Sequence, residues 1–154
     1  MKKKLVAIFL FIFIIKLILL QFITVPLGYS DSLAYMESAK VFFETQSLAE
    51  IAETAKFPPL YSIVLSLAYF SQDMHTVFFL IKLINALLSS LVLIPAYFLA
   101  KEFLQKKQAL LLATIITILP PIFASTFYPF SENLFFPLFL FAIYFLLKAF
   151  TENK

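Results

Sequence analysis

Two acidic residues stand directly beside long apolar segments of this 154-residue chain, where their carboxylates could do chemistry. Asp31 follows the first apolar run, and Glu132 opens the last one. Two carboxylates from separate loops could bind a divalent cation such as Mg²⁺ or Mn²⁺, and one of them could act as a base toward an acceptor hydroxyl. Both residues also suit structural roles, because Asp31 can cap a helix N-terminus and Glu132 can complement a helix dipole. The catalytic interpretation requires that the two carboxylates face one cavity.

Two lysines, Lys16 and Lys82, lie inside apolar segments. A lysine within a membrane costs about 2.5–3.5 kcal/mol on insertion scales, so it needs a function or a path to the interface. Lys82 is close enough to the interface to extend its ammonium group there. Lys16 lies deeper, and could neutralise the phosphate of a lipid-linked substrate or pair with an acid on another helix. Lys82 also forms a polar stripe with Asn85 and Ser89, which is typical of helix–helix contacts.

Several other kinds of site are excluded by composition. The chain has no cysteine, one histidine (His75) and one glycine (Gly28). A zinc site, a glycine-rich phosphate loop and a G-x-S-x-G serine hydrolase triad are therefore not expected. The lysines flank apolar segments instead of forming one basic face, so we expect no nucleic-acid partner.

The apolar segments predict an all-α membrane protein with four transmembrane helices. Hydrophobic residues make up 62% of the chain, charged residues only 14%, and the mean hydropathy is +0.97. Each span needs about 20 apolar residues. We place the spans at about residues 5–25, 76–100, 109–127 and 133–150, within a single domain over residues 1–154. The first run is long for a signal peptide and lacks an A-x-A cleavage site.

The lysines predict how these spans are oriented. Eight lysines fall on one side of the predicted membrane and two, Lys40 and Lys56, on the other. Because lysine is enriched on the cytoplasmic side, we expect both termini in the cytoplasm. We expect the membrane to be the plasma membrane of a prokaryote. The first eight are Lys2, Lys3, Lys4, Lys101, Lys106, Lys107, Lys148 and Lys154.

The outer loop, residues 26–75, is expected to lie on the membrane as interfacial helices. Helical spacing predicts one helix over 31–44 and another over 48–56, where Ser47 and Glu50 have capping-box spacing. A third helix, 60–70, is too short to span, so it is interfacial or re-entrant. The 109–127 span is interrupted by two prolines, Pro120 and Pro121.

Four motifs, in this order, resemble the amino-terminal part of the GT-C superfamily of membrane glycosyltransferases. Ser30-Asp31-Ser32-Leu33-Ala34-Tyr35 is similar to D-E-x-x-Y after the first span, and Phe57-Pro58-Pro59-Leu60-Tyr61 resembles H/K-x-P-P-L-Y. Lys82-Leu83-Ile84-Asn85-Ala86-Leu87 looks like R-L-x-S-A-L in the second span. Glu132 matches the acid of the second outer loop. Ser32 stands where the family has a second acid.

The resemblance implies transfer of a sugar from a polyprenyl-phosphate donor to an acceptor at the outer membrane face. Asp31 would act as base or acceptor-positioning group, and would bind the cation together with Glu132. The expected substrate-binding residues are Tyr35, Pro59, Tyr61, Lys16 and Lys82. The family's enzymes have many more spans, so we expect a truncated or split enzyme that a second membrane polypeptide completes.

Two other functions stay open at this stage. One is a non-catalytic membrane subunit, or a remnant, that packs against a partner membrane protein. The other is a small transporter, which the lack of an acid inside any predicted span disfavours.

The predicted topology can be tested with a tag inserted after Gln72. The 60–70 helix is expected to stay at the outer face, so the tag should react only with reagents added outside the cell. Labelling of the tag from the cytoplasm would show that this helix crosses the bilayer and that the topology is wrong.

Overall fold

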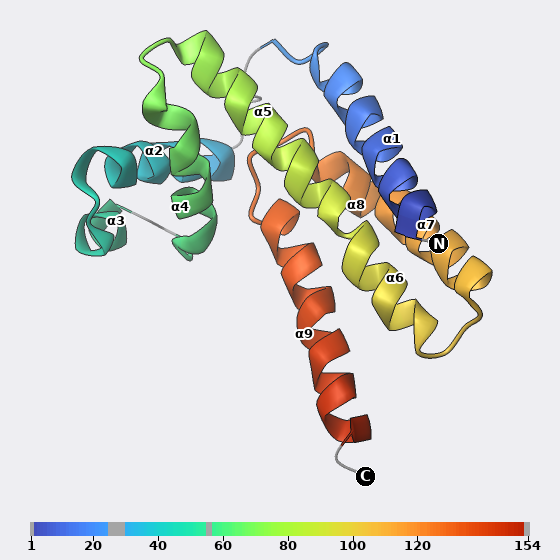
Figure 1. The fold of residues 1–154 in the computed structure, drawn as a ribbon. Coiled ribbons are helices and arrows are strands. Elements are labelled where there is room, and N and C mark those ends of the chain that lie inside the picture. The colour runs from blue at the N-terminus through green and yellow to red at the C-terminus, as the bar shows by residue number, and fades with distance from the viewer. Residues whose placement is uncertain (1, 25–29, 55–56, 153–154) are drawn as a thin grey trace.

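The computed structural model describes residues 2–24, 30–54 and 57–152, and within these ranges the chain is helical without a strand (Figure 1). This confirms the expected all-α class. The elements are α1 (Lys2–Leu20), α2 (Ser30–Thr45), α3 (Leu48–Thr54), α4 (Leu60–Ser66), the 3₁₀ turn η1 (Leu67–Phe70), α5 (Met74–Leu91), α6 (Leu93–Lys101), α7 (Lys106–Ile118), α8 (Pro120–Ser125) and α9 (Glu132–Glu152).

Two helical segments of the described chain, Met74–Lys101 and Glu132–Thr151, are long and apolar enough to cross a membrane. They correspond to the predicted spans 76–100 and 133–150. The predicted span 5–25 lies partly outside the described residues, and its helix α1 ends at Leu20. The predicted span 109–127 is divided between α7 and α8. Length and composition therefore support two of the four predicted spans.

Prolines explain both interruptions within these apolar helices. Leu119 precedes Pro120 and has extended torsion angles (φ −55°, ψ 140°), because a proline disfavours the helical conformation of the residue before it. This break was expected from the sequence. The break at Val92 between α5 and α6 was not, although Pro95 explains it: proline lacks the amide proton and its ring clashes with the carbonyl four residues earlier, here Leu91.

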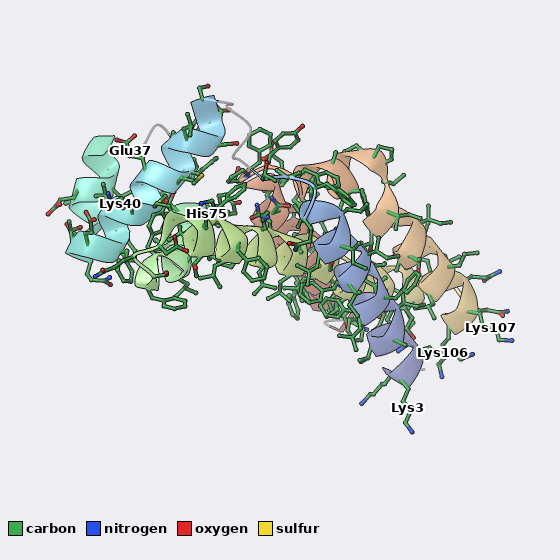
Figure 2. The ribbon with its side chains drawn as sticks, turned by 90° about the horizontal axis from the view of Figure 1, so that it is seen from above. Lys3, Glu37, Lys40, His75, Lys106 and Lys107 are labelled. Atoms are coloured by element: carbon green, nitrogen blue, oxygen red, sulfur yellow. The ribbon has the colours of Figure 1, made fainter. Side chains whose placement is uncertain are left out.

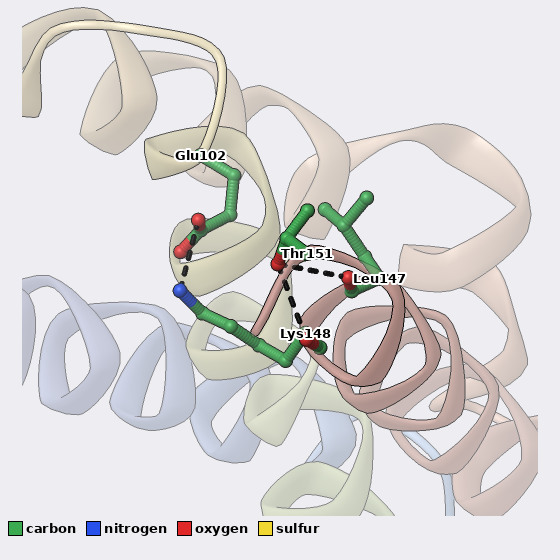
Figure 3. A network of polar contacts seen from close by, with 4 residues as sticks. All are labelled: Glu102, Leu147, Lys148 and Thr151. Carbon is green, nitrogen blue, oxygen red and sulfur yellow. Dashed lines mark hydrogen bonds and ion pairs between the residues drawn. The ribbon is translucent and has the colours of Figure 1, made fainter. Parts of the chain in front are cut away.

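The long helices alternate in direction, and their basic ends gather at one end of the molecule. Figure 2 shows Lys3, Lys106 and Lys107 at this end, with Glu37, Lys40 and His75 at the other. The Lys148 ammonium lies 3.0 Å from the Glu102 carboxylate, which ties α9 to the residue that follows α6 (Figure 3). The sequence predicted this segregation of lysines from the order of the spans.

The segments α2, α3, α4 and η1 form an outer layer on the amino-terminal part of α5 (Figure 1). The observed bounds of α2 and α3 agree with the predicted helices 31–44 and 48–56, of which residues 55–56 lie outside the described chain. The Ser47 hydroxyl accepts a hydrogen bond from the Glu50 amide at 3.3 Å, which is half of the predicted capping box. A shared apolar core holds the layer together: Tyr35, Met36, Ala39, Tyr61, Leu65, Ala68, Val77, Ile81 and Leu88.

Asp73 fixes the start of α5 just outside the longest apolar segment. Its carboxylate accepts hydrogen bonds from the Thr76 hydroxyl at 2.7 Å, the Thr76 amide at 2.9 Å and the His75 amide at 3.3 Å. These bonds, led by the one from the Thr76 hydroxyl, hold the pKa of Asp73 below its ordinary value. The ionised carboxylate is therefore the form that caps the helix.

Acidification is expected to open the first turn of α5. Because the folded-state pKa of Asp73 is depressed, its stabilising contribution is present above the unfolded-state pKa and is lost as the pH falls through the folded-state value. The amide resonances of His75 and Thr76 should then shift toward coil positions in NMR spectra of the full chain. Asp73→Asn, which can still accept a hydrogen bond, should show no such titration. A titration of equal size in both proteins would contradict the assignment.

Candidate functional site

Asp31 and Glu132 line the same cavity, at the end of the molecule opposite the clustered lysines. This cavity has a volume of about 350 Å³. Asp31 lies in the first turn of α2, and Glu132 is the first residue of α9. The structure thus brings together the two acids that the sequence placed on one membrane face, 101 positions apart. The other lining residues are Tyr35, Phe57, Pro58, Phe130 and Ser131.

A second hollow of about 390 Å³ adjoins the first and is mostly apolar. Both are lined by Pro58, Ser131 and Glu132. The apolar wall is formed by residues of α4 and α9, and three of its side chains, Leu60, Phe135 and Leu138, are exposed to the surroundings. We call this hollow the apolar groove; its remaining lining residues are Tyr61, Leu134 and Phe136. A cavity that contains two carboxylates therefore adjoins a groove suited to hydrocarbon.

The two carboxylates differ in their local partners. The Ser30 hydroxyl donates to Asp31 Oδ1 at 3.1 Å, so Asp31 is held at the start of α2. The Glu132 carboxylate is exposed and receives no hydrogen bond from the described residues. In the described part of the chain, no cluster of three or more histidine, cysteine or acidic side chains could hold a metal ion. Asp31 and Glu132 could therefore supply only part of the coordination of a cation.

Tyr35 and Tyr61 connect the cavity to the interior. The Tyr35 ring stacks on Phe57 with the centroids 5.0 Å apart, and meets the Tyr61 ring edge-on at 5.1 Å. The Tyr61 hydroxyl donates to Asn85 Oδ1 at 2.6 Å. Burial raises the pKa of Tyr61 well above its ordinary value, and hydrogen bonding to the Asn133 and Asn85 side chains offsets only part of this rise. Tyr61 therefore keeps its proton and serves as a hydrogen-bond donor.

Pro59 has a backbone role in this structure. It stands at the N-cap of α4, and its carbonyl accepts the Ile63 amide at 2.9 Å. The neighbouring Pro58, and not Pro59, lines both the cavity and the apolar groove.

A buried amide, Asn133, organises the turn that carries Glu132. Its Nδ2 atom donates to the backbone carbonyls of Ser125, Tyr128 and Phe130 at 2.9, 3.0 and 3.1 Å. Asn85 Nδ2 donates to the same Tyr128 carbonyl at 3.0 Å. The turn before α9 is therefore fixed to α5 and, through Tyr61, to α4. Sequence reasoning assigned Asn133 no role; the signal was an amide directly after Glu132 at the start of an apolar helix.

Lys16 and Lys82 lie outside the walls of the cavity and the apolar groove. Lys16 is fully buried, and its ammonium donates to Ser89 Oγ at 2.8 Å and lies 5.5 Å from the centre of the Phe123 ring. Ser89 also accepts the Thr126 hydroxyl at 2.8 Å. Lys16 thus joins α1 to α5 and to the residue after α8, and its expected contact with substrate stays a prediction.

Lys82 closes the end of α1. Its ammonium donates to the Leu20 and Ile23 carbonyls at 3.2 and 3.1 Å. The last carbonyls of a helix have no intrahelical partner, and a lysine near them also interacts favourably with the helix dipole. Its expected role toward the donor phosphate is likewise untested.

Comparison of the chain with protein-family models, with curated proteins and with solved structures gave no significant match. The resemblance to the GT-C superfamily therefore depends on the four sequence motifs.

The Tyr61 hydrogen bond is expected to stabilise the site measurably. Tyr61→Phe leaves the buried Asn85 oxygen without this donor, which should lower the free energy of unfolding by about 1–3 kcal/mol. Reversible denaturation of the full chain in detergent micelles would measure the loss. Tyr97→Phe is the matched control, because Tyr97 is also buried and its hydroxyl forms no hydrogen bond with the described residues. Equal losses in the two variants would contradict the assigned role of Tyr61.

Proposed function

We propose that this chain forms the acceptor side and part of the donor side of a membrane glycosyltransferase. It would transfer a sugar from a polyprenyl-phosphate carrier to an acceptor at the outer membrane face. One observation carries the proposal: two carboxylates, Asp31 and Glu132, line a cavity that adjoins an apolar groove and shares lining residues with it. A lipid-linked sugar is amphipathic in the same way, with a polar head on a hydrocarbon chain.

The proposed orientation follows from charge. In it, α1, α5–α6, α7–α8 and α9 all cross the plasma membrane of a prokaryote, with the lysine end in the cytoplasm. The cavity and the outer layer of α2, α3 and α4 then face the outside. This arrangement supports a donor that reaches the site from the bilayer, because the apolar groove is bordered by exposed side chains of α9.

The charge of the cavity favours a cation-dependent enzyme. Its described lining residues include two acids and no lysine, so without a bound cation they would repel an anionic donor phosphate. Mg²⁺ is commonly held by one or two carboxylates together with substrate phosphates, and this donor set fits it; Mn²⁺ is the alternative. The bound cation would neutralise the phosphate charge.

The proposed reaction is a displacement at the anomeric carbon of the donor sugar. Asp31, which is exposed and lines the cavity, takes the proton of the acceptor hydroxyl as the hydroxyl oxygen bonds to that carbon. The bond between the anomeric carbon and the phosphate oxygen breaks, and the polyprenyl phosphate leaves with the bonding electrons. Glu132, at the junction of cavity and groove, would hold the cation.

A second candidate function is supported by the surface of α9. About half of the described residues of this helix are exposed, among them the apolar side chains of Phe139, Phe145, Leu146 and Phe150. Such a surface can face lipid or a second membrane polypeptide. The alternative is therefore a non-catalytic membrane subunit that packs against a partner through α9; under the main proposal the same partner completes the enzyme.

Loss of either carboxylate should abolish transfer. In membranes that contain the chain and its partner polypeptide, Asp31→Asn is expected to lower transfer of a radiolabelled sugar by about 10²–10⁴-fold, the range for general acid–base groups. Glu132→Gln should also lower transfer, because it weakens binding of the cation. Removal of divalent cations with a chelator should have a comparable effect. Glu37→Gln removes an exposed acid of α2 that does not line the cavity, and should leave the rate unchanged. Full activity of a correctly inserted Asp31→Asn protein would exclude Asp31 from the mechanism.

A further inference from the structure

We infer that a groove between α1 and α7, at the lysine end of the molecule, binds an anionic phospholipid. We call it the lipid groove. The inference depends on the membrane orientation proposed above, but it does not depend on sugar transfer, because this groove lies at the opposite end of the helices from Asp31 and Glu132.

The lipid groove has a volume of about 380 Å³ and is built from one face of each helix. Lys4 and Ile8 are four residues apart in α1, so their side chains lie above one another on one face. The residues of α7 follow the same helical spacing: Lys107, Leu110, Leu111 and Thr114. Figure 2 shows the ends of α1 and α7 side by side, with Lys107 projecting from this end.

The wall below the two lysines is apolar. Ile8 packs against the core between α6 and α7, and Leu110 is largely buried in the same core. The Thr114 hydroxyl donates to the Leu110 carbonyl at 2.8 Å, which satisfies its polar group within α7. Leu111, by contrast, is 63% exposed. This wall fits an acyl chain better than a water-soluble ligand.

The charge at the mouth of the lipid groove selects for a negative headgroup. Lys4 and Lys107 are exposed, and neither forms an ion pair with the described residues. Glu102 is the acid at this end whose side chain the structure describes. It is already paired with Lys148, so it does not neutralise Lys4 or Lys107. Basic pockets between transmembrane helices on the cytoplasmic side are typical sites for anionic lipid headgroups. The occupant is therefore a lipid with net negative charge, such as phosphatidylglycerol, and not zwitterionic phosphatidylcholine.

The test compares two double variants of the full chain that carry the same change in charge. Lys4→Gln with Lys107→Gln removes both lysines from the lipid groove. Lys3→Gln with Lys106→Gln removes the preceding lysine of each helix, and neither of these lines it. Each protein is purified in mixed micelles of phosphatidylglycerol and phosphatidylcholine, and the retained lipid is counted by native mass spectrometry.

The original chain is expected to retain one phosphatidylglycerol in preference to phosphatidylcholine. The Lys4/Lys107 variant should lose this preference by about tenfold or more, since each lysine near an anionic surface contributes a factor of about five. The Lys3/Lys106 variant should keep most of it. Equal losses would show diffuse attraction without a site, and no loss in either variant would also overturn the inference. Displacement of the lipid by inorganic phosphate would assign the lysines to a free anion instead.

Discussion

The position of the candidate site depends on one buried amide, Asn85. Its side chain is almost fully shielded from solvent, so both of its polar atoms need partners inside the protein. Its oxygen accepts from the Tyr61 hydroxyl and its nitrogen donates to the Tyr128 carbonyl. This fixes α4 and the turn before α9 to the same point of α5. Because α2 packs on α4, Asp31 is brought to the cavity that Glu132 lines.

A second polar contact lies one helical turn away on α5. The buried Lys16 ammonium and the Thr126 hydroxyl both donate to Ser89, which in turn donates to the Asn85 carbonyl. Polar groups buried in a bundle are costly unless they are satisfied, and such contacts specify which helices are neighbours. The site is thus supported by side chains of α1, α4, α5 and α9 together. At the opposite end, the Lys148–Glu102 ion pair connects α9 to the residue that follows α6.

Sequence patterns predicted the faces and ends of helices better than they predicted which residues of different helices contact one another. The helices at 31–44 and 60–70 and the interruption at Pro120 follow from local spacing and proline chemistry. The location of Asp31 and Glu132 at the same end of the molecule follows from the alternating direction of the successive long helices. The hydrogen bonds of Lys82 to the end of α1, the three bonds of Asn133 and the position of Pro58 in the cavity wall depend on tertiary packing. The break caused by Pro95 could have been recognised, because that proline lies inside an apolar run.

Photo-crosslinking tests the central claim most directly, namely that a lipid-linked sugar lies across the cavity and the apolar groove. A polyprenyl-phosphate sugar with a photoreactive group in its hydrocarbon chain would be activated in membranes containing the full chain, and the labelled peptides would be identified by mass spectrometry. The account predicts label on the groove residues of α4 and α9, Leu60, Phe135 and Leu138 among them, and competition by unlabelled donor. Absence of label from both helices, or label confined to the lysine end, would contradict it.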